Sequence, residues 1–141
     1  MTIRAFFATL VLAATLGAAN AFAEELVVIT HTPHAHIAQS TLRAIFAMRL
    51  RQWSDDDTPI TVFVLRSSDP IHAVFCKRTL EIFPYQLQRV WDRLVYSGTG
   101  QAPIEVTSIE EMKQRVSSTI GAIGYITTDR LDERVYPLQV Q

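Results

Sequence analysis

One stretch, Ile60 to His72, restricts the possible folds of this chain more than any other. It opens with a run of β-forming residues, Ile60–Leu65, that lacks the alternating polar residues of a strand with one wet face. Such a run indicates a strand covered on both faces, which is typical of parallel sheets in α/β proteins. Asp69 and Pro70 then favour the start of a helix, because Asp caps helix N-termini and Pro suits the first helical position. The stretch therefore predicts a strand, a tight turn and a helix, the unit of an α/β fold.

The turn between this strand and this helix is the first candidate site. In α/β sheets, ligands bind at the carboxyl ends of strands, where helix N-termini point. An oxyanion site there would use residues in and after the turn: Arg66, Ser67, Ser68, Asp69 and His72. The alternative is that Asp69 only caps the helix and the two serines only turn the chain.

The first 23 residues have the pattern of a secretory signal peptide, so 24–141 is expected to form one domain. Arg4 supplies a positive charge, an apolar run follows from Ala5 to Leu16, and Ala21-Phe22-Ala23 has the form of a cleavage site. The apolar run is shorter than the ~20 residues that a membrane-spanning helix needs. These features predict a secreted protein of the bacterial periplasm with no membrane segment after cleavage; the alternative is an uncleaved N-terminal anchor.

Charge and cysteine content exclude some classes of function. The chain has 13 basic and 14 acidic residues and a net charge of −1, so the clustered basic charge of a nucleic-acid-binding protein is not indicated. Cys76 is the single cysteine, which rules out an intramolecular disulfide. His72 and Cys76 are one helical turn apart, but Cys76 fits a small buried residue and no third catalytic group is evident. We expect no enzymatic activity and no cofactor.

The remaining elements follow from apolar periodicity and from capping signals. The first strand is expected at Leu26–Ile29, a helix from Ile37, another from Tyr85 to about Tyr96, a short helix capped by Ser108 and Glu111, a buried strand at Gly121–Ile126 and an edge strand within Val135–Val140. Together they predict a single α/β domain with a mostly parallel sheet flanked by helices.

The four histidines form the second candidate site. His31, His34 and His36 follow the first expected strand, and His72 follows the second. If these two strands are parallel neighbours, all four imidazoles lie at one edge of the sheet with Asp69 beside them. Imidazoles and a carboxylate are ligands for zinc, copper or nickel. The alternative is that the loop histidines are only solvated, because their spacing matches no standard zinc motif.

The order and spacing of several motifs resemble one known family, the periplasmic phosphate-binding proteins of ABC transporters, of the type 2 periplasmic-binding-protein fold. The matching residues are Ile45-Phe46 with Trp53, the strand Ile60–Leu65, Phe75 with Leu80, Trp91, Ser97-Gly98, Pro103, Glu111-Met112, Val116 and Gly121-Ala122-Ile123-Gly124-Tyr125. The last of these motifs is the most specific. Because a full-length member has two lobes, the resemblance is to its short relatives with a single lobe.

The resemblance also implies a ligand and a departure from the family pattern. In the family, an anion is received at the N-terminus of the helix after the second strand by a Ser-Gly-Thr-like turn with a nearby Arg. Here Asp69 takes the Ser position and Pro70 follows, while Arg66 remains close by. The resemblance therefore implies a non-enzymatic binding module that takes phosphate or a related oxyanion weakly, or that docks a periplasmic protein or a second copy of itself. The alternative function is transition-metal binding through the loop histidines.

Overall fold

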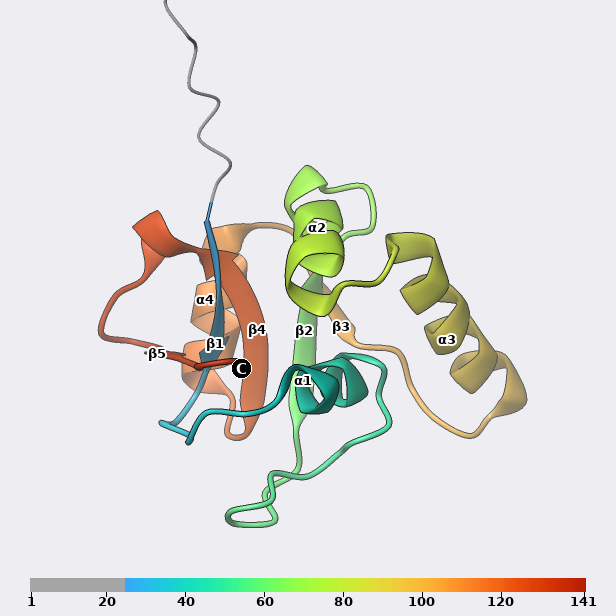
Figure 1. The fold of residues 1–141 in the computed structure, drawn as a ribbon, viewed down its shortest axis with the longest axis horizontal. Coiled ribbons are helices and arrows are strands. Elements are labelled where there is room, and N and C mark those ends of the chain that lie inside the picture. The colour runs from blue at the N-terminus through green and yellow to red at the C-terminus, as the bar shows by residue number, and fades with distance from the viewer. Residues whose placement is uncertain (1–24) are drawn as a thin grey trace, which may run out of the picture.

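The computed structural model describes residues 25–141 as a five-stranded sheet with helices on both faces (Figure 1). The strands are β1 (Leu26–Thr30), β2 (Thr61–Leu65), β3 (Ile104–Val106), β4 (Ala122–Thr127) and β5 (Tyr136–Pro137). The helices are α1 (Gln39–Phe46), α2 (Pro70–Val74) with the π-helix Phe75–Leu80 directly after it, α3 (Pro84–Ser97), α4 (Ile109–Ser118) and a 3-10 helix, Thr128–Arg130. The expected signal peptide lies outside these residues. Within them, no helix is both long and apolar enough to cross a membrane.

The order of the strands is β3-β2-β4-β1-β5. β2 runs parallel to β3 and β4, whereas β1 runs antiparallel to β4 and β5. The predicted α/β class is confirmed, because four of the five strands run in one direction and only β1 is reversed. The expectation that the first two strands are parallel neighbours is wrong, because β4 lies between them and β1 runs in the opposite direction.

Alternating residues of β4 show which helices cover which face of the sheet. A Cβ atom added to Gly124 would meet the side chains of Met112 and Val116, so this residue faces α4. The next residue, Tyr125, stacks on Phe75 with ring centroids 3.8 Å apart, so it faces the opposite layer. Since neighbouring strand residues point to opposite faces, α4 covers one face of the sheet and the layer of α1 and α2 covers the other.

The strand and helix expected at Ile60–His72 are both present. The last four residues of β2 are buried, as the apolar run predicted, and Asp69 caps α2 through a hydrogen bond from the Ile71 amide (2.9 Å). The π-helix after α2 ends at Leu80, and the next residue, Glu81, caps it with a positive φ of 53°. Helix α3 begins at Pro84, one residue before the expected start.

One strand, β3, was not expected from the sequence. It has only three residues, and two of them are exposed at the edge of the sheet. So short an edge strand carries too little apolar periodicity to stand out from a loop. Its pairing with β2 is nevertheless important, because the register Leu65↔Val106 places the end of β3 beside the candidate turn.

Candidate functional site

The candidate turn lies at the carboxyl end of β2. The Asp69 amide donates a hydrogen bond to the Arg66 carbonyl (2.9 Å), which closes the turn. Arg66, Ser67 and Ser68 are all exposed. Within residues 25–141, the Arg66 guanidinium makes no hydrogen bond or ion pair, and neither do the two serine hydroxyls. The turn therefore presents a guanidinium, two hydroxyls and two backbone amides to solvent.

The start of α2, in contrast, has few free donors. The Asp69 carboxylate accepts the Ile71 amide, and the Asp69 carbonyl accepts the amides of His72 (3.1 Å) and Ala73 (3.4 Å). Pro70 has no amide hydrogen to donate. An anion at this edge would thus depend on the turn itself and would lie close to a carboxylate.

A second carboxylate, that of Glu111, lies at the neighbouring strand end. Its Oε2 accepts hydrogen bonds from the Thr107 amide (2.7 Å) and hydroxyl (2.6 Å), while the Glu111 amide donates to the Ser108 hydroxyl (3.0 Å). The Thr107 hydroxyl bond is the main cause of a lowered pKa at Glu111, and the charge of Arg66 also contributes to the shift. The Asp69 carboxylate thus caps α2, while the Ser108 hydroxyl caps α4 and the Glu111 carboxylate accepts from Thr107 just before that cap. The role of Ser108 as a cap was predicted; the contact between Glu111 and Thr107 was not.

His72, which the sequence placed in both candidate sites, belongs to the core instead. It is 1% exposed, and its Nδ1 lies 2.6 Å from the Tyr125 hydroxyl oxygen, which also accepts the Leu65 amide (2.9 Å). The direction of the bond between this hydroxyl and Nδ1 depends on the tautomer of the imidazole. The other ring nitrogen, Nε2, lies 3.5 Å from the Cys76 sulfur. Both ring nitrogens are engaged, so His72 is not available to an anion in the turn.

This buried chain of polar groups is uncharged at neutral pH. Burial lowers the pKa of His72, raises the pKa of Cys76 to about 12 and raises the pKa of Tyr125 further above its usual value. A thiolate nucleophile is therefore disfavoured at Cys76. The geometry supports the interpretation of Cys76 as a buried core residue.

Acidification is expected to destabilise the fold through His72. In the unfolded chain, this imidazole takes up a proton as the pH falls through about 6.5, whereas the folded state resists protonation. The contribution of neutral His72 to the free energy of unfolding is therefore complete above about pH 6.5. Below that pH, it decreases by up to about 1.4 kcal/mol per pH unit. Three carboxylates also have lowered pKa values: those of Asp56, Glu111 and Asp132. Their contributions to stability are lost only when the pH falls below the usual pKa of a carboxyl group, about 4.

Urea denaturation at about pH 7.5 and at about pH 5.5 would measure this pH dependence. His72→Gln, which cannot titrate, should show a smaller loss of stability between the two conditions than the wild type. The same loss in both proteins would contradict the assignment to His72.

The other three histidines lie at the opposite end of the strands from the candidate turn. The reason is that β1 runs antiparallel to β4 and β5, so its carboxyl end lies beside the amino end of β4. His31 Nδ1 lies 3.1 Å from the Val116 carbonyl oxygen. His34 stacks on Trp53 (3.8 Å between ring centroids), and its Nδ1 is 2.9 Å from the Asp55 carboxylate. His36 is exposed. The predicted cluster of four histidines beside Asp69 is therefore wrong, and within residues 25–141 no group of three or more His, Cys, Asp or Glu is placed to hold a metal ion.

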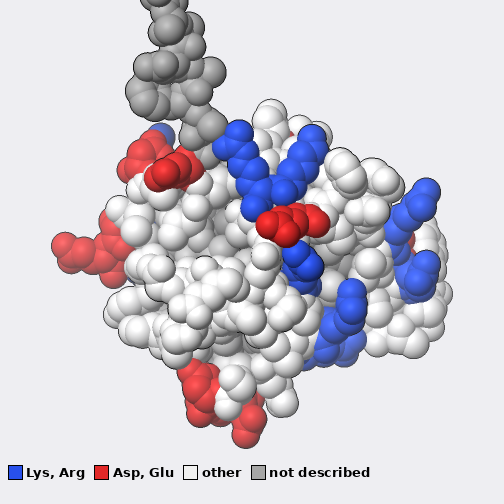
Figure 2. Space-filling view, viewed as in Figure 1, with Lys and Arg blue, Asp and Glu red and all other residues white. Residues whose placement is uncertain are grey.

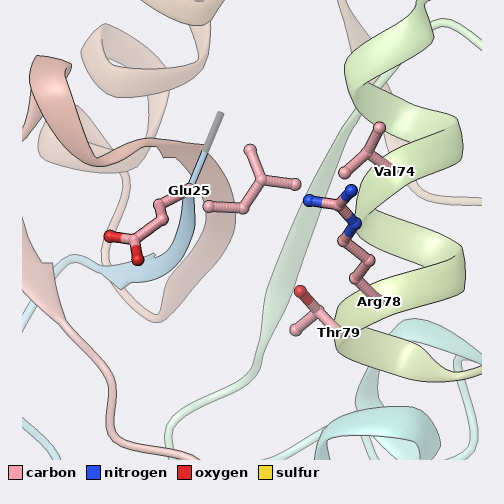
Figure 3. A pocket seen from close by; sticks show the side chains of 5 residues that line it. Glu25, Val74, Arg78 and Thr79 are labelled. Atoms are coloured by element: carbon pink, nitrogen blue, oxygen red, sulfur yellow. The ribbon is translucent and has the colours of Figure 1, made fainter. Parts of the chain in front are cut away.

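A hollow of about 390 Å³ between the start of β1 and the π-helix was not anticipated. Figure 3 shows the Arg78 guanidinium directed across it from the helix, with Glu25 on the other side. The remaining lining residues are Leu26, Val74 and Thr79. Arg78 makes no ion pair within the described residues. The sequence did not predict this hollow, because its two sides come from segments some fifty residues apart. One side is also formed by a π-helix, whose spacing differs from that of an α-helix.

Comparison with solved structures relates this geometry to known proteins. An ABC-type phosphate transport receptor from Vibrio cholerae has 17% sequence identity and a TM-score of 0.64, and the match covers 83% of this chain and 46% of the receptor. A putative phosphate ABC transporter substrate-binding protein from Clostridium perfringens, solved with bound phosphate, matches 83% and 45% (18% identity, TM-score 0.67). PstS from Borrelia burgdorferi matches 84% and 47% (21% identity, TM-score 0.65).

The chain shares its fold with phosphate-transport receptors. This confirms the predicted resemblance, and the chain spans a little under half the length of these structures, which is consistent with a single lobe. No family model matches the sequence, and no curated protein matches it significantly. At these identities the likeness establishes the fold, while the ligand has to be argued from the residues of this chain.

Proposed function

We propose that this chain is a non-enzymatic periplasmic binding module that takes inorganic phosphate or a related oxyanion with low affinity at the turn Arg66–Ser68. The observation that carries the proposal is the turn itself. It exposes a guanidinium, two hydroxyls and two amides at the carboxyl end of a parallel strand, where α/β sheets bind their ligands. The fold shared with phosphate-binding proteins and the signal-peptide pattern of residues 1–23 support the class and the location.

The low affinity follows from the two carboxylates at the same edge. Asp69 consumes the Ile71 amide, and Glu111 consumes the amide and hydroxyl of Thr107, so neither helix start offers these donors to a ligand. Each carboxylate also repels an incoming anion. The remaining attraction comes mainly from Arg66, whose charge is exposed to water and to screening ions.

Replacing Asp69 with asparagine is therefore expected to strengthen phosphate binding. Asparagine caps helices about as well as aspartate, so α2 should still form. Removing a unit charge about 6 Å from phosphate is worth about 1 kcal/mol in a water-rich setting, which corresponds to about a fivefold gain in affinity. Titration with phosphate, followed by the amide NMR signals of Ser67 and Ser68, would measure the change.

Two further variants test the site. Arg66→Ala should abolish the phosphate-dependent shifts, and Arg93→Ala on α3 should leave them unchanged, although it removes the same charge. The ionic strength is held constant with sodium chloride. If phosphate shifts no signal near the turn in either the wild type or Asp69→Asn, the proposed ligand is wrong.

A further inference from the structure

Helix α3 presents a row of aromatic and basic residues to solvent. Tyr85, Arg89, Arg93 and Tyr96 follow one another at helical spacing along its outer side, and Tyr96 is 89% exposed. The inner side is fixed by Leu87 and Trp91, which are buried. The Trp91 indole N–H also donates to the Phe46 carbonyl (2.8 Å), which anchors α3 against α1. Figure 1 shows α3 at the periphery of the fold, and the four residues of the outer row are exposed.

The N-terminal end of this row continues into a hollow of about 290 Å³. Lys77, Glu81, Ile82 and Phe83 line the hollow. Phe83 is 54% exposed and stacks on Tyr85 (5.8 Å between ring centroids), while the Arg89 guanidinium lies 5.7 Å from the Tyr85 ring. The aromatic rings, the basic side chains and the hollow thus form one continuous surface. Exposed aromatic and arginine side chains of this kind are enriched at protein interfaces.

The charge of this surface is positive and largely unbalanced. Lys77, Arg89 and Arg93 are exposed and make no ion pair within residues 25–141. Of the two nearby acids, Glu81 pairs with Arg43 (3.1 Å). Asp92, which accepts a hydrogen bond from Gln88 (2.9 Å), offsets only one of the three positive charges. In Figure 2, Lys and Arg gather over the part of the face where α2 and α3 lie, while most Asp and Glu lie along the opposite side and the bottom.

We propose that this α3 surface (Lys77, Phe83, Tyr85, Arg89, Arg93 and Tyr96) docks an acidic protein segment that inserts an aromatic or aliphatic side chain into the hollow beside Phe83. Acidic residues of the partner would pair with Arg89 and Arg93, and the inserted side chain would be covered by Phe83 and Ile82. The proposal is independent of the oxyanion site, because it uses other elements of the fold.

The same features argue against two other occupants. A second copy of the chain, paired symmetrically through α3, would bring Arg89 and Arg93 against their own counterparts, and like charges repel. A lipid surface would require a broad apolar face on the helix. The apolar side of α3, with Leu87 and Trp91, is turned into the core.

Fluorescence anisotropy with a labelled peptide would test the proposal. The probe is a short peptide of Asp and Glu with one central Phe, and the comparison peptide has Ala in place of Phe. The wild-type protein should bind the Phe peptide about tenfold more tightly than the Ala peptide, and sodium chloride should weaken both complexes. Phe83→Ser should remove the preference for Phe, because the inserted side chain then loses its cover.

Charge reversal provides the second arm of the test. Arg89→Glu combined with Arg93→Glu should lower the affinity for the Phe peptide by at least about tenfold. Arg115→Glu, which makes the same kind of change on α4 across the sheet, should leave it within about twofold. Thermal melting checks that each variant is folded; if Phe83→Ser is not, Tyr96→Ser replaces it, with an expected loss of affinity.

Three outcomes would overturn the proposal. Equal binding of the Phe and Ala peptides by the wild type would show attraction by charge alone. Binding to phosphatidylglycerol vesicles without binding to the peptide would indicate a lipid surface. Self-association of the wild type that is lost in Arg89→Glu would indicate an interface between copies of this chain.

Discussion

Replacing Gly121 with alanine is expected to lower the free energy of unfolding by at least about 3 kcal/mol. Gly121 has a φ of +75°, a conformation that costs a residue with a Cβ atom about 1–2 kcal/mol. The added Cβ would also collide with the Pro59 backbone carbonyl, which cannot move aside as a side chain would. The Gly121 carbonyl accepts hydrogen bonds from the Thr61 amide and the Trp53 indole, so displacement of this backbone would disturb both.

Gly98 supplies a matched control for this substitution. Its φ is +69°, close to that of Gly121, but an added Cβ would meet nothing within 4 Å. Gly98→Ala should therefore cost only the free energy of the left-handed backbone conformation, about 1–2 kcal/mol. Urea denaturation would give the loss in free energy of unfolding for each variant. The difference between the two losses is the cost of the collision with Pro59. Equal losses of stability would show that the approach of Pro59 is not restrictive.

Replacing Tyr125 with phenylalanine is the second large effect, with an expected loss of about 2–4 kcal/mol. The change retains the ring that stacks on Phe75 and removes only the hydroxyl. It leaves the Leu65 amide without an acceptor and His72 Nδ1 without its hydrogen-bond partner, and both groups lie in the core. A buried polar group without a partner costs about 1–3 kcal/mol.

Tyr96→Phe serves as the control, because it removes the same hydroxyl from a side chain that is 89% exposed. Its effect on the free energy of unfolding, measured by urea denaturation, should be within about 0.5 kcal/mol. If Tyr125→Phe were equally mild, the chain of hydrogen bonds from Leu65 to Cys76 would contribute little to stability.

The parts of the fold that depend on neighbouring residues could be predicted from the sequence. The burial of β2, the Asp69 cap, the start of α3 near Pro84 and the Ser108 cap all follow from residue types within a few positions of each other. The direction of β1 depends instead on pairing between Leu26 and Thr127, which lie about a hundred residues apart. An apolar run indicates burial, but it does not indicate the direction in which its neighbours run.

In the candidate site too, features that depend on local sequence were predictable and features that depend on distant pairing were not. Exposure of the turn Arg66–Ser68 and the capping role of Asp69 were predictable, because both are local. The approach of Glu111 was not, since it depends on the unexpected pairing of β3 with β2. The burial of His72 did have a signal. It lies one helical turn before Cys76 and close to Phe75, a position on the inward side of the helix.

The separation of charge across the molecule has a kinetic consequence. The chain is nearly neutral, with a net charge of −1, yet on the face shown in Figure 2 its cations gather over α2 and α3 while most anions lie elsewhere. Such an arrangement produces an electric dipole. In the field of a charged partner, the dipole would turn the protein toward productive orientations before contact and raise the rate of encounter at low ionic strength.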